Sequence, residues 1–223
     1  MKLSLIFVVT LSLLAAGCVS GPPPKDYTAF RAADPHSILV LPALNNTVSV
    51  EASDYFLSTV SKPFAERGYY VFPAHMVKSV LEKEGLADTG LIYQADTRRL
   101  GRLFDCDAAL YISIEKWEAK YAILKTVTTV AFNYSIRSCK TGEELWSNFA
   151  QMQYSPQNSS SANPLAALIA DAIVAAMEKA APRYIPLAQQ ANFLASATAG
   201  SGIPGGPYQP AQYKKDENQF PAK

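Results

Sequence analysis

The sequence predicts an α/β fold, in which a single domain packs helices on a mixed sheet that ends in an antiparallel meander. Two patterns along the chain predict this fold. Between residues 37 and 104, short apolar runs typical of buried strands alternate with segments of helical periodicity. Between residues 108 and 154, three segments instead show the strand patterns of a meander. About 200 residues follow the N-terminal signal described next, which is a common length for one domain with its own core.

The first 18 residues have the layout of a bacterial lipoprotein signal. The apolar stretch Leu3–Leu14 lies between a charged start and small residues, and it is too short for a membrane-spanning helix, which needs about 20 residues. Cys18 directly follows Ala15-Ala16-Gly17, as in a lipobox, although Leu is more usual than Ala15. We therefore expect a signal peptide over residues 1–17 and diacylglyceryl attachment to Cys18. The alternative is an ordinary cleaved signal with an incidental cysteine.

The residues after Cys18 predict a location and a tether. Val19 stands where Asp would favour retention in the inner membrane, so we expect a lipid anchor in the outer membrane. The sequence leaves open whether the domain faces the periplasm or the medium. Residues 18–35 include the run Gly21–Pro24, and we expect them to form a stiff lipidated tether.

The domain begins with a strand and a helix. Ser37–Leu41 is a short buried strand that Pro42 ends. The helix that follows has Ser49 or Ser53 as its N-cap, and Pro63 in its pattern should kink the helix or face solvent. Its apolar stripe includes Phe56, Val60 and Phe64.

Three further elements precede the meander. Tyr69–Pro73 is a second short strand. Met76–Glu84 has apolar residues at helical spacing, and Gly85 ends this helix. Thr97–Phe104 has the pattern of another short helix.

The meander consists of Ala108–Trp117, Thr126–Ser138 and the less regular Leu145–Tyr154, with a turn at Lys140–Glu143. In the first two strands apolar side chains fall on even-numbered residues, which predicts that one face is buried. These residues are Leu110, Ile112, Ile114, Val130, Phe132, Tyr134 and Ile136.

Cys106 and Cys139 flank the first hairpin of the meander. Thiols of exported proteins usually oxidise, and this spacing fits no zinc motif, so we expect a disulfide between them. Pairing of the two even-numbered faces requires opposed residue numbers with an even sum, whereas 106 and 139 have an odd sum. The bridge therefore requires cysteines beyond the regular ladder, or a bulge. Two buried free thiols are the alternative.

A final helix is predicted after Asn163-Pro164, which form its cap and first residue. The helix Leu165–Ala181 is rich in Ala, so a second element can approach it closely. We consider this helix and the helix that contains Phe56 as candidate contact surfaces, although packing on the domain's own sheet also explains the stripe of the final helix.

The chain ends in a segment rich in Gly, Pro, Ser and Gln, without a periodic apolar pattern. Such a composition does not form regular core elements. We therefore place the α/β domain at residues 36–194 and expect residues 195–223 to be a disordered tail.

The sequence contains no recognisable catalytic, cofactor or metal motif. We interpret His36 and His75 as surface or capping residues, and Asp105 with Asp107 as part of a solvated turn. Two further clusters are interpreted as a solvated helix face and a loop: Arg98-Arg99 with Arg102, and Ser159–Ser161. We expect no cofactor, no metal and no enzymatic activity.

The charge balance excludes nucleic acid as an expected partner. Removal of Lys2 with the signal leaves 19 basic residues against 19 acidic ones. No basic stripe of the kind that phosphate contacts require is present in the sequence.

The segments Leu14–Cys18 and Phe56–Pro73 resemble a family of bacterial outer-membrane lipoproteins that includes a genome-derived meningococcal surface-antigen candidate. The resemblance covers nearly the whole chain. The layout is more distantly similar to the N-terminal domain of the Tol translocation protein, to the curli-secretion channel lipoprotein and to penicillin-binding-protein activator lipoproteins. That similarity is carried by Ser37–Pro42 with Asn45-Asn46-Thr47, and by Leu100–Leu110.

The resemblance implies a non-catalytic accessory component of an envelope transport, secretion or assembly complex. Such a protein acts through contacts with another envelope lipoprotein or channel component, and we expect a homodimer anchored to the membrane through its N-terminal lipid. One alternative is an activator of a peptidoglycan synthase. A second alternative is an envelope hydrolase without a recognisable motif.

Overall fold

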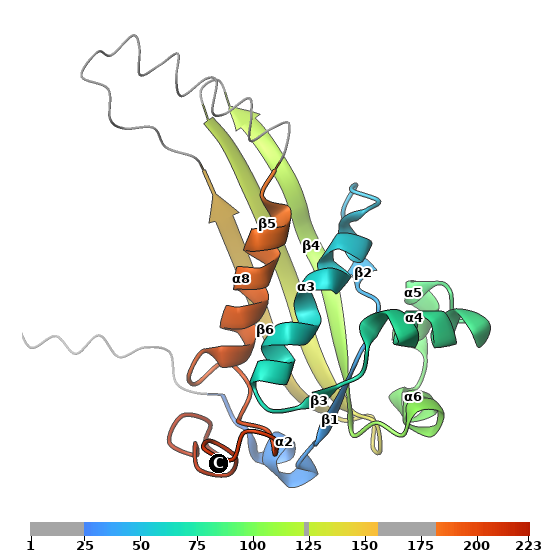
Figure 1. Ribbon diagram of the computed structural model, residues 1–223, viewed down its shortest axis with the longest axis vertical. Helices are drawn as coiled ribbons and strands as arrows, with labels where there is room; N and C mark the ends of the chain where they lie inside the picture. Colours follow the sequence, from blue (N-terminus) through green and yellow to red (C-terminus); the bar gives the residue numbers. More distant parts are fainter. Residues whose placement is uncertain (1–24, 123–124, 156–181) are drawn as a thin grey trace, which may run out of the picture.

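The computed structural model describes residues 25–122, 125–155 and 182–223 (Figure 1). The lipidation residue Cys18, the predicted helix Leu165–Ala181 and the loop Ser159–Ser161 lie outside these residues.

The strands form a mixed sheet in the order β3-β1-β4-β5-β6, with β2 paired to β4. The first half of the sheet is parallel, since β1 pairs in that sense with β3 and β4, and β2 does so with β4. The long strands β4, β5 and β6 are antiparallel, which confirms the predicted meander. The strands are β1 (Ser37–Val40), β2 (Leu44–Asn45), β3 (Tyr70–Val71), β4 (Ala108–Ala122), β5 (Lys125–Ser138) and β6 (Glu144–Tyr154).

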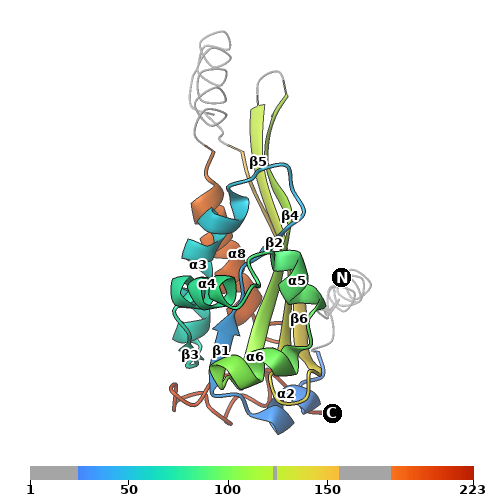
Figure 2. The same ribbon diagram turned by 90° about the vertical axis from the view of Figure 1, so that its right-hand side faces the viewer.

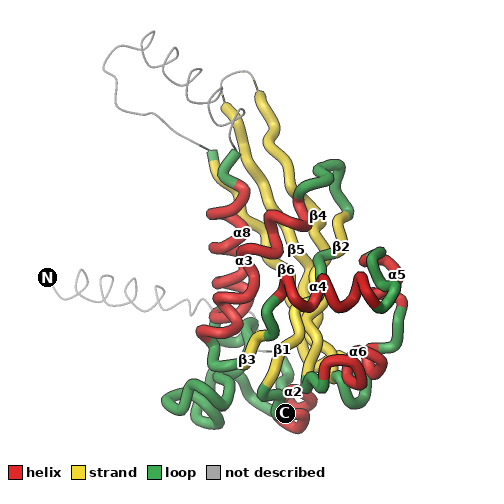
Figure 3. Tube along the Cα trace, turned by 45° about the vertical axis from the view of Figure 1, so that its right-hand side comes forward, coloured by secondary structure: helices red, strands yellow, loops and turns green. Residues whose placement is uncertain are grey.

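Helices cover both faces of the sheet. The two long helices, α3 (Ala52–Glu66) and α8 (Tyr184–Ala197), lie side by side on one face, and Figure 2 shows them edge-on against the strands. Three shorter helices lie beside β1 and the start of β4, as Figure 3 shows. These are α4 (Ala74–Lys83), α5 (Thr89–Gln94) and α6 (Thr97–Phe104).

The two helical layers explain the apolar patterns. In β1, Ile38 and Val40 belong to the core under α3 and α8, whereas Leu39, together with Leu41 just after the strand, belongs to the core under the short helices. This burial on both sides is why the sequence of β1 is a continuous apolar run rather than an alternating one. Pro63 is buried inside α3, so the expectation that it would face solvent is wrong for that helix.

The register of the first hairpin agrees with the predicted pairing of even-numbered faces. Ile114 opposes Phe132 and Ala108 opposes Ser138, and both pairs have an even sum. A bulge after Ile114 shifts the upper part of the hairpin by one residue, which keeps Trp117 on the buried face with Val130. Cys106 and Cys139 lie beyond the last pair of this ladder, and a disulfide joins them across a Cα–Cα distance of 5.9 Å.

The structure corrects the expected disorder of residues 195–223. Helix α8 continues through Ala197, and the remaining residues fold back over the end of the sheet, where Ile203 and Phe220 are fully buried. The composition of the tail disfavours regular helices and strands. The tail is instead held by turns and by single side chains inserted between other elements.

The tether is also shorter than expected. Within residues 18–35, helix α2 (Thr28–Ala33) forms directly before β1, and both Tyr27 and Phe30 are buried in the main core. These two aromatic residues, spaced by three, were the sequence signal for this element. In the structure the domain therefore includes residues from Lys25 onwards.

Candidate interaction surfaces

The two histidines lie at the surface of the domain. His36 precedes β1 and His75 lies in the first turn of α4, and both are exposed. Among the described residues, neither imidazole takes part in a hydrogen bond or an ion pair. The ring of His36 instead meets the ring of Tyr213 edge-on, with a centroid distance of 6.4 Å.

Asp107 has a structural position between β1 and β4. Its carboxylate accepts hydrogen bonds from the backbone N–H groups of His36 and Ser37, both at 3.1 Å, and it pairs with Lys140. Partial burial opposes ionisation, but these hydrogen bonds and the Lys140 charge together hold the pKa of Asp107 below its usual range. Asp105 is the exposed left-handed cap of α6, so the two carboxylates do not form a catalytic pair.

The basic cluster on α6 is solvated, as expected. Arg98, Arg99 and Arg102 are all exposed. Arg98 pairs with Asp96, the N-cap of its own helix, at 2.7 Å.

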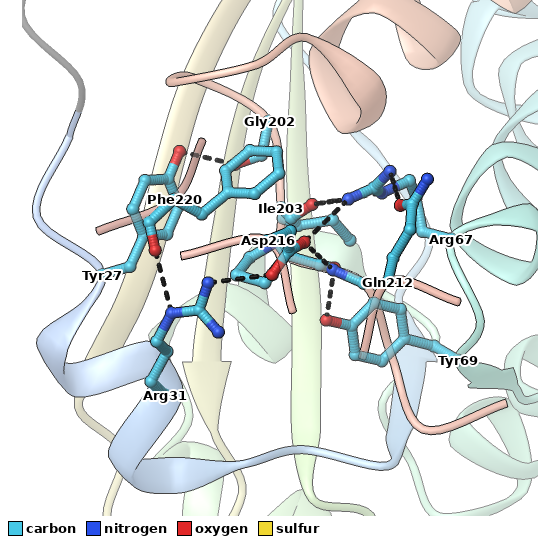
Figure 4. Close-up of polar contacts among 11 residues, drawn as sticks. Tyr27, Arg31, Arg67, Tyr69, Gly202, Ile203, Gln212, Asp216 and Phe220 are labelled. Carbon is cyan, nitrogen blue, oxygen red and sulfur yellow. Dashed lines mark hydrogen bonds and ion pairs between the residues drawn. The ribbon is translucent and has the colours of Figure 1, made fainter. Parts of the chain in front are cut away.

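The C-terminal tail forms a polar cluster that sequence reasoning missed (Figure 4). We call residues 198–223 and their contacts with Arg31 and Arg67 the terminal clasp. The buried carboxylate of Asp216 accepts hydrogen bonds from Arg31 Nη2 at 2.9 Å and from the Gly205 N–H at 2.7 Å. Its second oxygen lies 3.7 Å from Nη2 of Arg67.

Aromatic residues complete the terminal clasp. Tyr27 donates its hydroxyl to the carbonyl of Gly202 at 2.8 Å, and its ring meets Phe220 edge-on. Tyr69 donates its hydroxyl to the carbonyl of Pro204, also at 2.8 Å. The terminal clasp thus joins α2, the end of α3 and the tail into one unit.

The short helices cover only part of their face of the sheet. The uncovered part contains a shallow hollow of about 480 Å³. Its polar side chains bind one another: Ser135 donates to Glu144 at 2.7 Å, and Arg137 lies 4.6 Å from the centroid of the Tyr111 ring. Lys25 borders the hollow and donates to the carbonyl of Ser147. Partial burial lowers the pKa of Lys25, against the opposing effect of Glu144. The hollow is polar and already hydrogen-bonded.

The outer face of α8 differs from this hollow because it is uncharged and exposes apolar side chains. The helix contains no Asp, Glu, Lys or Arg. Three of its large apolar side chains are nevertheless exposed: Ile185 at 39 %, Phe193 at 52 % and Leu194 at 42 %. Gln189 and Gln190 lie on the same exposed side. An uncharged helix face of this kind is typical of contact surfaces.

In residues 25–122, 125–155 and 182–223, no helix is long and apolar enough to cross a membrane. Within the same ranges, no group of three or more His, Cys, Asp or Glu side chains is placed to hold a metal ion.

Comparisons with known proteins give a family. The sequence model of the GNA1162-like lipoproteins matches residues 25–208. A lipoprotein of Neisseria meningitidis serogroup B (strain ATCC BAA-335 / MC58), NMB1124/NMB1162, is 35 % identical over 161 residues, which cover 72 % of this chain and 75 % of the relative.

A solved structure of the family agrees with the fold. The crystal structure of lipoprotein GNA1162 from Neisseria meningitidis matches with a TM-score of 0.53 and 34 % identity, over 64 % of this chain and 98 % of that one. PelC from Paraburkholderia phytofirmans, solved as a dodecamer, covers 79 % of this chain and 93 % of its own at a TM-score of 0.41 and 14 % identity, which is too distant to bear on function or assembly. The chain belongs to the GNA1162-like family of lipoproteins.

Proposed function

We propose that this lipoprotein is a non-catalytic accessory component of an envelope transport, secretion or assembly complex, anchored by lipid to the outer membrane. The observation that carries the proposal is the exposed, uncharged face of α8. A lipid anchor accounts for the place of the protein, and a contact surface accounts for its action.

The α8 face is uncharged and largely apolar, as is typical of a buried helix, yet it is exposed to solvent. Covering a large aliphatic or aromatic side chain contributes about 1.5–3 kcal/mol when the side chain goes from fully exposed to buried. Ile185, Phe193 and Leu194 are roughly half exposed, so each offers on the order of 1 kcal/mol to a partner. Gln189 and Gln190 add hydrogen-bonding groups without the desolvation cost of a charge.

The same face is compatible with a second copy of the chain. Two-fold symmetry brings the same surface of both copies together, and an uncharged face brings no like charges together. A homodimer through α8 is therefore part of the proposal, beside a contact with another envelope lipoprotein or channel component.

The anchor keeps the start of the domain near the membrane. Seven residue steps separate the proposed lipidated Cys18 from Lys25, and an extended chain spans at most about 3.5 Å per residue, or about 25 Å in total. Cys18→Ala should release the protein from the membrane fraction and abolish acyl labelling. Persistent labelling of the variant would contradict lipidation at this residue.

The deciding experiment is photo-crosslinking in intact cells with the reactive residue at position 193. Leu91 on α5 is the matched control position, because it is apolar and 50 % exposed on a different helix. Recovery of a channel-forming lipoprotein from position 193 alone supports the proposal, and self-links alone support the dimer. A captured peptidoglycan synthase would favour the activator alternative. Equal, diffuse capture from both positions would refute a specific role for α8.

A further inference from the structure

The loop between β2 and α3 exposes two valines almost completely. Val48 is 99 % exposed and Val50 is 90 % exposed. Figure 1 shows this loop beyond the end of α3, away from α2 and the C-terminus. Single exposed apolar residues are common, but two neighbouring fully exposed aliphatic side chains in one loop form a potential contact point.

The loop holds the two valines in a defined conformation. The side-chain oxygen of Asn45 accepts hydrogen bonds from the backbone N–H and the hydroxyl of Thr47, at 3.0 Å and 2.7 Å. The side-chain amide of Asn45 donates to the carbonyl of Ser49 at 2.7 Å. The backbone N–H of Asn46 donates to the carbonyl of Ile114 at 3.0 Å, which fixes the loop to β4. A partner therefore meets valines that are already positioned, and binding orders little further chain.

Charge around the loop indicates the kind of partner. Glu51 follows Val50 directly, and Glu115 accepts hydrogen bonds from the side-chain amides of Asn46 and Asn133. Among the described ion pairs, neither Glu51 nor Glu115 takes part. Residues 43–61 contain no Lys or Arg. The two valines thus project beside two carboxylates that stand outside the described ion pairs, with Lys116 as the basic residue that follows Glu115 in β4.

We propose that Val48 and Val50 insert into an apolar pocket of a protein partner whose rim carries Lys or Arg. An anionic membrane surface is a poorer occupant, because the carboxylates repel its headgroups and the loop provides no basic residue to attract them. The inference rests on the proposed function in one respect, namely that the partner is an envelope protein, but it concerns a surface separate from α8.

The test is photo-crosslinking of the full lipidated chain in intact cells with the reactive residue at position 48. Met76 on α4 is the control position, since it is apolar and 66 % exposed. We expect a discrete protein adduct from position 48 and not from 76, with the linked peptide containing apolar residues beside Lys or Arg. The charge variants Glu51→Gln and Glu115→Gln together should reduce the adduct severalfold, and Val50→Ser should reduce it about tenfold.

Three outcomes would overturn the inference: no adduct specific to position 48, an adduct indifferent to the two charge variants, or a linked peptide without basic neighbours. Sedimentation of the full chain carrying Cys18→Ala with phosphatidylglycerol vesicles tests the membrane as occupant. Vesicle binding that Val48→Ser abolishes would overturn the protein pocket. Success at position 48 with failure at position 193 would refute the α8 contact and leave this inference standing.

Discussion

Replacement of Asp216 by Ala tests whether the terminal clasp stabilises the domain. The change removes a carboxylate with a relative exposure of 5 %, which serves both Arg31 and Arg67 and also accepts the N–H of Gly205. Both guanidinium groups remain in place with side chains that are mostly buried, and they lose the charge that compensates for their burial.

The expected cost follows from the partners that remain. Breaking a buried ion pair by removing one partner typically costs about 3–5 kcal/mol. Arg31 retains its hydrogen bond to the carbonyl of Phe220, and Arg67 retains its hydrogen bonds to the Ile203 carbonyl and to Gln212. We therefore expect the lower end, about 3 kcal/mol. For a domain of this size that loss lowers the Tm by about 6–12 °C.

Urea unfolding measures the loss in the free energy of unfolding of the whole domain. Limited proteolysis measures local opening of the tail. Glu217→Ala is the matched control, because it removes the neighbouring carboxylate from an exposed position and should change the free energy of unfolding by no more than about 0.5 kcal/mol. If the tail opens before the domain unfolds, trypsin should cleave the Asp216→Ala variant after Lys214 and Lys215 under native conditions. An Asp216→Ala variant as stable and as protease-resistant as Glu217→Ala would show that the terminal clasp contributes nothing to stability.

Three further changes test other contacts. Non-reducing peptide mapping should link Cys106 to Cys139, and replacing both by Ser should lower the free energy of unfolding by about 3–4 kcal/mol, since the bridge spans 33 residues; two alkylatable thiols in the oxidised protein would show that the bridge is absent. Asp107→Asn should lower the free energy of unfolding at neutral pH. Because the pKa of Asp107 is lowered in the folded protein, this difference from the unchanged protein should shrink as the pH falls below about 4. A difference that does not vary with pH would contradict the role of the charge. Gly101→Ala should destabilise α6 despite the better helix propensity of Ala, because the added Cβ would lie 2.4 Å from the Cys139 carbonyl oxygen. Gly90→Ala is the control and should be tolerated, because its Cβ meets only a movable side chain. A Gly101→Ala variant that is more stable than the unchanged protein would refute the close approach.

The meander could be predicted because its signal is local. Alternation on even-numbered residues of β4 and β5 is visible in short windows, and it correctly implied both the buried face and the even register. The bulge after Ile114 could not be read from that pattern, because it depends on how the two strands meet.

The terminal clasp could not be predicted because its contacts are not local. Arg31 and Asp216 are 185 residues apart in sequence, and neither stands in a motif. Phe220 was a single aromatic residue in polar surroundings, so its burial against Tyr27 gave no periodic signal. The same reason applies to the loop valines, whose significance lies in their exposure rather than in a pattern.

The meeting of the two ends of the described chain has a consequence for the order in which the protein matures. The N–H of Tyr27 donates to the carbonyl of Pro221, and Lys223 donates to the Thr28 hydroxyl across 195 residues of sequence. The partners of α2 lie up to 195 residues later in the chain, so this helix cannot reach its final position until they are available. A chain cut before Pro221 would leave both α2 and the tail loose at once, and proteases could then distinguish it from the intact domain.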